Sequence, residues 1–88
     1  MSDKETLLEF PCDFPVKVVG RSTEEFEALV RQIVERHAGP VDSSRMRSRP
    51  SRDGNFVALT CLIRAESQAQ LDALYQELSD NPDILMAL

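Results

Sequence analysis

The sequence holds little of the chemistry that makes covalent cross-links, metal sites or membrane anchors. It has two cysteines, Cys12 and Cys61, one histidine, His37, and no tryptophan. Because the cysteines lie far apart and belong to no Cys-x-x-Cys or Cys/His cluster, we expect two reduced thiols, no metal and no cofactor. No apolar run reaches the roughly 18 residues of a membrane span, and residues 1–6 lack the apolar stretch of a secretory signal. The sequence therefore predicts a cytoplasmic protein with no membrane partner.

The composition is that of one small globular domain. Of 88 residues, 42% are hydrophobic and 28% are charged, which favours an ordered chain over a disordered one. A chain of this length builds one modest core and little else. We expect residues 1–12 to form a partly ordered N-terminal segment and residues 13–88 to form a single domain.

The charge is unevenly distributed along the chain. The net charge is −5, yet residues 44–54 hold a single acid, Asp53, and four arginines: Arg45, Arg47, Arg49 and Arg52. An acidic body with one basic hairpin makes nucleic-acid binding unlikely as a general property, but it suits a local anion or an acidic protein partner.

Two segments have the apolar period of a helix. In the first, Ser22 and Glu25 match a capping box, and the stripe that follows comprises Phe26, Leu29, Val30, Ile33 and Val34. Gly39 and Pro40 end this helix, and His37 in its last turn is expected to have a structural role. In the second, Ser67 and Gln70 match a capping box ahead of the stripe Leu71, Leu74, Tyr75 and Leu78.

Four segments are predicted strands: residues 14–19, 44–50, 56–63 and 84–88. The strand at 56–63 is apolar on both faces and is therefore expected at the centre of a sheet. The order βαββαβ predicts an α+β, ferredoxin-like fold with two helices on one face of a four-stranded antiparallel sheet. The first and third strands are then central. The helix-covered face would hold Val16, Val18, Leu59, Cys61 and Ile63, and the other face would hold Lys17, Val19, Phe56, Ala58, Thr60 and Leu62.

That second face has no cover unless residues 7–10 fold onto it, so it is a candidate association surface. Arg45, Arg47 and Arg49 alternate along the predicted edge strand and would project to one side. They either keep another chain from pairing with the edge or, together with Phe56, bind an acidic partner. Both interpretations remain open on the sequence alone.

Several short segments, by their order and spacing, resemble the bacterial YbeD-like proteins. They are Leu-Leu-Glu-Phe-Pro at 7–11, Phe14 with Lys-Val-Val-Gly at 17–20, Arg-His-Ala at 36–38, Arg-Pro-Ser at 49–51, Gly-Asn-Phe at 54–56 and Leu-Tyr-Gln-Glu-Leu at 74–78. The resemblance implies a ferredoxin-like fold similar to the ACT regulatory domains. It brings no established catalytic or binding residues.

We expect a non-catalytic regulatory or binding domain, a monomer or weak homodimer, that takes a small metabolite or a protein partner, possibilities that the similarity to ACT domains favours slightly. ACT-type domains bind amino acids near the first strand–helix junction, whose counterpart here is Gly20, Arg21 and Ser22. Free amides at a helix N-terminus favour an anion there, although a tight turn explains Gly20 equally well.

Two alternatives from other classes have some support in the sequence. An acylphosphatase-like enzyme would use an arginine after the first strand, where Arg21 lies, but the glycine-rich phosphate loop is missing. A single-stranded RNA-binding module would use aromatic platforms on the uncovered sheet face, where Phe56 is the only aromatic candidate.

Overall fold

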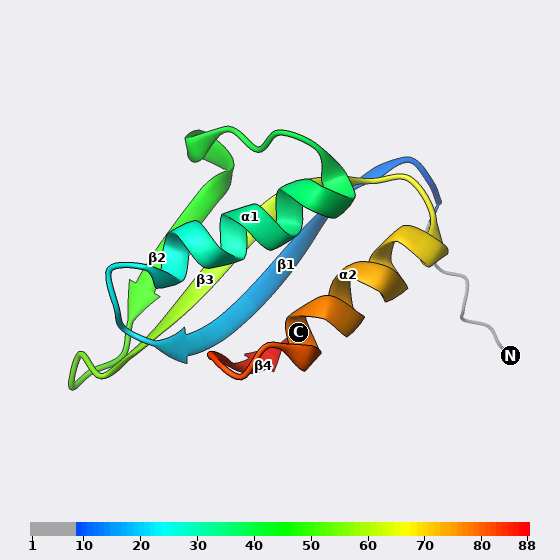
Figure 1. Ribbon diagram of the computed structural model, residues 1–88. Coiled ribbons are helices and arrows are strands. Elements are labelled where there is room, and N and C mark those ends of the chain that lie inside the picture. Colours follow the sequence, from blue (N-terminus) through cyan, green and yellow to red (C-terminus); the bar gives the residue numbers. More distant parts are fainter. Residues whose placement is uncertain (1–8) are drawn as a thin grey trace, which may run out of the picture.

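The computed structural model describes residues 9–88. Its elements are β1 (Cys12–Arg21), α1 (Phe26–Ala38), the short 3-10 helix η2 (Ser43–Arg45), β2 (Met46–Pro50), β3 (Phe56–Ala65), α2 (Gln68–Asp80) and β4 (Ile84–Ala87). The strands form one antiparallel sheet in the order β2-β3-β1-β4, and both helices lie on the same face of it (Figure 1). The predicted α+β, ferredoxin-like arrangement is therefore confirmed, with β1 and β3 at the centre.

The core lies between the sheet and the two helices. The predicted helix-covered set of Val16, Val18, Leu59, Cys61 and Ile63 is at most 2% exposed. The helices contribute the buried residues Phe26, Val30, Ile33, Val34, Leu71, Leu74 and Leu78. The apolar face of the sheet and the apolar stripes of the two helices therefore pack against each other as predicted.

The N-terminus of α1 differs from its prediction. The helix begins at Phe26, its N-cap is Glu25, and no side chain caps it. The predicted capping box of Ser22 and Glu25 is wrong, because the Ser22 amide donates to the Asn55 oxygen at 3.0 Å and so continues the pairing of β1 with β3. β1 accordingly extends to Arg21, beyond the predicted end of the strand at residue 19.

The capping box of α2 is confirmed. The Ser67 hydroxyl oxygen accepts a hydrogen bond from the Gln70 amide at 3.1 Å. The Gln70 side-chain oxygen accepts from the amide of Glu66, one residue before the cap, at 2.6 Å. Together these bonds satisfy backbone donors that a helix start leaves without intrahelical partners.

The second strand, β2, begins at Met46, two residues after the predicted start at residue 44. Ser43–Arg45 form η2, whose N-cap Asp42 accepts a hydrogen bond from the Ser44 amide at 3.3 Å. Arg45 therefore does not join Arg47 and Arg49 on a regular strand, which corrects that part of the prediction. Its guanidinium instead donates to the Leu62 carbonyl at 3.3 Å and lies 3.5 Å from an Asp13 carboxylate oxygen.

Phe10, just before β1, lies on the helix side of the sheet. Phe10 is partly buried against the core between sheet and helices, so its side chain does not cover the opposite face. The predicted contribution of Leu7 and Leu8 lies outside the described residues.

The two cysteines differ in burial, and we expect them to differ in reactivity. Cys61 is 0% exposed and Cys12 is half-buried, and both are free thiols. Burial raises the pKa of Cys61 to about 11, which keeps it in the unreactive thiol form. In native protein at pH 8, a thiol reagent should modify Cys12 first and Cys61 only on unfolding. Mass spectrometry of a Cys12→Ser variant checks this, and fast modification of that variant without denaturant would contradict the assigned strand orientation.

Candidate functional site

A hollow of about 350 Å³ lies where β1, the start of α1 and the start of β4 meet. We call it the junction hollow. Its lining residues are Arg21, Thr23, Glu25, Phe26, Leu29, Pro82, Asp83 and Leu85. The lining combines one cation, two carboxylates, one hydroxyl and an apolar wall. Such a mixture of an apolar surface with a few charged groups is typical of a small-molecule site.

Gly20 shapes this junction by having no side chain. A Cβ atom at position 20 would lie 2.2 Å from a ring carbon of Phe26 and 2.8 Å from the Asp83 carbonyl oxygen. Gly20 is inside β1, paired with Val57 and Ile84, and is not part of a tight turn. The tight-turn interpretation is therefore wrong, and Gly20 instead permits the Phe26 ring to pack against the strand.

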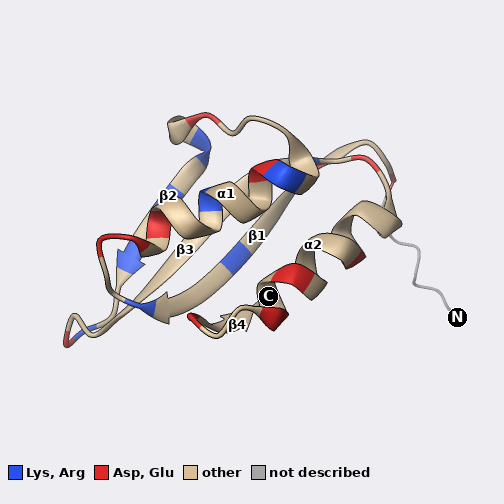
Figure 2. Ribbon diagram, in the orientation of Figure 1, with Lys and Arg blue, Asp and Glu red and all other residues tan. Residues whose placement is uncertain are grey.

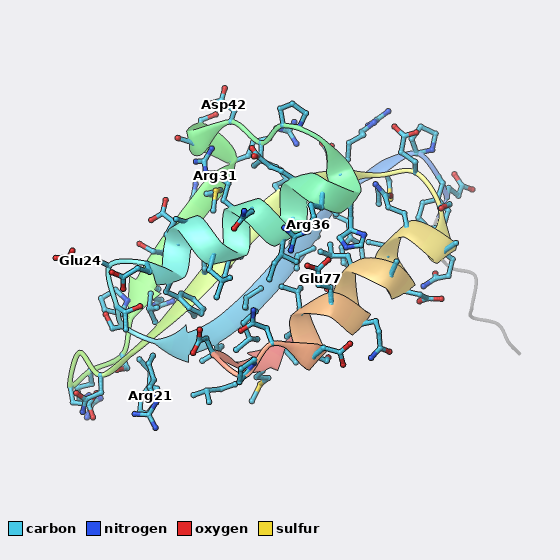
Figure 3. All side chains as sticks on the ribbon, viewed as in Figure 1. Arg21, Glu24, Arg31, Arg36, Asp42 and Glu77 are labelled. Carbon is cyan, nitrogen blue, oxygen red and sulfur yellow. The ribbon has the colours of Figure 1, made fainter. Side chains whose placement is uncertain are left out.

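The three sequence-predicted ligand residues have different surroundings. Arg21 lines the junction hollow, and its side chain extends outward from the end of β1 (Figure 3). The Ser22 amide donates a hydrogen bond to the Asn55 main-chain carbonyl, so it is not available to an anion. Sequence reasoning missed Phe26, Asp83 and Leu85 as neighbours of Arg21. No local signal joins them, since Asp83 and Leu85 reach the junction only when β4 pairs with β1.

A second candidate region is the face of the sheet turned away from the helices, which we call the open face. Residues directly opposite one another in antiparallel strands share a face. Lys17, Thr60 and Arg47 accordingly form one row across β1, β3 and β2. A second row comprises Met86, Val19, Ala58 and Arg49. Arg47 and Arg49 thus line the β2 side of this face, Lys17 lies on the central strand β1, and the apolar Val19 and Met86 lie beside it on β1 and β4.

The cations of the open face differ in their partners from the cations near the helices and at Asp13. Arg31 donates to the Val41 carbonyl at 2.8 Å, Arg36 pairs with Glu77, and Arg45 and Arg64 lie near Asp13. By contrast, Lys17, Arg47 and Arg49 of the open face make no side-chain hydrogen bond or ion pair with another residue of the range 9–88, and neither do Arg21 of the hollow and Arg52 of the turn. Figure 2 shows blue segments along β1 and β2 and only red ones on α2.

His37 belongs to an ionic cluster that joins the two helices. Its Nε2 atom lies 2.7 Å from one carboxylate oxygen of Glu77. The Arg36 guanidinium donates a hydrogen bond to the other oxygen of that carboxylate, and the Arg36 and Glu77 side chains point toward each other between α1 and α2 (Figure 3). These hydrogen bonds hold the pKa of Glu77 below its usual value. The described residues contain no group of three His, Cys, Asp or Glu side chains that could hold a metal ion. The cluster therefore has the geometry of a helix-to-helix contact.

Comparison with known proteins identifies relatives over nearly the whole chain. Residues 5–88 match the family model "Protein of unknown function (DUF493)". The chain is 45% identical over 85 residues to the UPF0250 protein NE1487 of Nitrosomonas europaea, covering 97% of this chain and 98% of that protein. It is 42% identical to a UPF0250 protein of Paraburkholderia phytofirmans, covering 99% and 98%. The resemblance to the YbeD-like proteins is confirmed by these matches.

Solved structures share the fold at low sequence identity. The solution structure of protein HP0495 from H. pylori is similar with a TM-score of 0.77 and 13% identity, covering 97% of this chain and 89% of that one. The C-terminal domain of the MgtC protein from Mycobacterium tuberculosis gives a TM-score of 0.61 with 21% identity, covering 93% and 89%. Among residues 9–88, no helix combines the length and apolar character that crossing a membrane demands.

Proposed function

The chain belongs to the DUF493 family of proteins of unknown function, and we propose that it is a non-catalytic regulatory domain that binds a small zwitterionic metabolite in the junction hollow. The metabolite class is an amino acid with an apolar side chain. The observation that carries the proposal is the lining of the hollow, in which one cation and two carboxylates surround an apolar wall within about 350 Å³.

Each part of such a ligand has a counterpart in the hollow. Arg21 on the rim suits a carboxylate, because a guanidinium can donate two parallel hydrogen bonds to it. Glu25 and Asp83 suit an ammonium group. The volume is at the lower end of the roughly 300–1,000 Å³ of ligand pockets, which favours a small metabolite.

The apolar wall would select the ligand's side chain. Phe26, Leu29 and Leu85 line the hollow beside the charged groups. Phe26 is buried in the core, whereas Leu85 is 54% exposed and would gain cover from a bound apolar group. Binding would therefore connect the start of α1 to β4.

The charges of the hollow also distinguish this proposal from an acyl-phosphate enzyme. Two carboxylates, Glu25 and Asp83, would repel a phosphate dianion, and the Ser22 amide is already bonded to Asn55. A ligand with a positive and a negative group meets neither obstacle. The proposal places this binding in the cytoplasm, where free thiols such as Cys12 and Cys61 persist.

The test is an NMR titration of the 15N-labelled protein with apolar amino acids. We expect concentration-dependent shifts at the amides of Arg21, Thr23, Phe26 and Asp83. Arg21→Gln should weaken binding about tenfold or more, because it removes a charged hydrogen-bonding partner. The matched control is Arg52→Gln, which makes the same change in the turn between β2 and β3, outside the hollow.

The deaminated analogue of the best amino acid makes the test specific. Asp83→Asn should weaken binding of the amino acid, because it removes the carboxylate that would bind the ammonium group. Binding of the analogue should stay unchanged, since the analogue has no ammonium group. Absence of shifts in the hollow with every apolar amino acid at millimolar concentration would contradict the proposal. Equal effects of Arg21→Gln and Arg52→Gln would contradict it as well.

A further inference from the structure

The open face carries a second, independent inference. We propose that it docks an acidic amphipathic helix of a partner protein, with the acidic flank of the helix over β2 and Lys17 and its apolar stripe over Val19 and β4. The junction hollow has no part in this proposal, so the two fail or succeed separately.

The charge of the open face favours an acidic partner. Lys17, Arg47 and Arg49 are exposed on a protein whose net charge is −5. They make no side-chain hydrogen bond or ion pair within residues 9–88, although the cations near the helices and at Asp13 do. Cations without a partner among residues 9–88 attract acidic groups of another molecule.

The apolar side of the same face favours a partner that also buries apolar surface. Two large apolar residues beside β1 on this face, Met86 and Leu88, are 51% and 61% exposed. Met86 is paired with Val19 on the open face, and Leu88 exchanges main-chain hydrogen bonds with Lys17. An exposed apolar margin beside a cationic one is the complement of an amphipathic segment.

The dimensions of the face suit a helix. Neighbouring strands lie about 4.8 Å apart, so β2 and β4 are separated by roughly 14 Å across the sheet. A helix with its side chains is about 10–12 Å across, so it covers most of this width. Two shallow depressions, of about 200 and 290 Å³, lie between β2 and β3, where Phe56 lines the first and Thr60 the second. They offer places for side chains of the docked helix.

The same observations disfavour two other occupants. A second copy of this chain stacked through the open face would bring Lys17, Arg47 and Arg49 close to the same residues of its partner, and like charges repel. A single-stranded RNA would need several aromatic platforms, whereas Phe56 is the only aromatic residue among those that line the two depressions. Both occupants are outcomes of the test.

The test uses two synthetic peptides of about 18 residues, longer than the roughly 12–15 that an isolated helix needs in water. Both carry the same leucine stripe, and one has glutamates on the flank where the other has lysines. In 15N–1H spectra at low salt, the glutamate peptide should shift the amides of Val19, Ala58, Thr60, Arg47 and Arg49. The lysine peptide should not. Binding should weaken from 20 to 150 mM salt, where the screening length falls to about 8 Å.

Charge reversal gives the decisive comparison. The double variant Arg47→Glu/Arg49→Glu should bind the glutamate peptide about tenfold more weakly and should now bind the lysine peptide. Because both side chains are exposed, the fold should persist, and the spectrum verifies it. Arg52→Glu, which reverses one charge outside the open face, is the control for the single variants Arg47→Glu and Arg49→Glu, each of which makes the same change of charge on that face. Equal binding of both peptides to the native protein, tighter binding of an oligouridine at these residues, or a dimer that Met86→Glu dissociates would each overturn the proposal.

Discussion

Replacing Ile33 with alanine is expected to lower the free energy of unfolding by about 2–5 kcal/mol. Ile33 is 1% exposed and lies on the stripe of α1 that faces the sheet, so truncation leaves a cavity that the surrounding core fills only in part. In a domain this small, that is a large fraction of the roughly 5–15 kcal/mol of total stability. Urea denaturation followed by circular dichroism measures the change.

Two controls accompany the Ile33 variant. Ile33→Val removes one methyl group and should cost about 0.5–1.5 kcal/mol. Gln32→Ala changes the exposed neighbour on the same helix and should stay within about 0.5 kcal/mol of the native protein. A loss below about 1 kcal/mol for Ile33→Ala would show that α1 does not present this side chain to the core.

Gly20→Ala is expected to destabilise the protein by about 1–3 kcal/mol, and by more if the strand cannot shift. The added methyl group meets the Phe26 ring at 2.2 Å, and the Asp83 carbonyl oxygen, which is backbone, at 2.8 Å. The Phe26 ring must move, and since Phe26 lines the junction hollow, the proposed binding of amino acids should weaken as well. Denaturation and the NMR titration measure the two effects.

A double-mutant cycle identifies the cause of the Gly20 effect. In a Phe26→Leu background the ring is gone, so Gly20→Ala should cost less than it does in the native protein, and the two changes should not add. Gly54→Ala is the contrasting control. Gly54 has φ of +80°, and a Cβ atom at this position would have no neighbour within 4 Å, so its cost of about 1–2 kcal/mol is conformational and independent of Phe26. Additive costs for Gly20→Ala and Phe26→Leu would rule out the steric explanation.

The arginine hairpin shows how a correct local pattern becomes a different surface in three dimensions. Arg47 and Arg49 alternate on β2 as the sequence predicts, but Arg45 is drawn into η2 and toward Asp13. Asp13 is on β1 and reaches Arg45 only because β1, β3 and β2 are adjacent in the sheet. Arg47 and Arg49 remain on β2, and Lys17 from β1 lies in the same row of the open face as Arg47. The edge-protection interpretation stays a prediction for Arg47 and Arg49, while the proposed docking role uses the whole row.

The amino-acid sequence by itself determined the elements and the face that each one buries. The α1 stripe around Ile33, the capping box of Ser67 and the inward direction of Cys61 follow from side chains a few positions apart, because helical and strand periods are local properties. Only the tertiary structure decided the end of β1 at Arg21, the role of Gly20 and the composition of the junction hollow. Those depend on Asn55, Asp83 and Leu85, which lie more than 30 positions along the chain from Gly20. Their approach is set by strand pairing and helix packing, and no periodicity within a single segment encodes it.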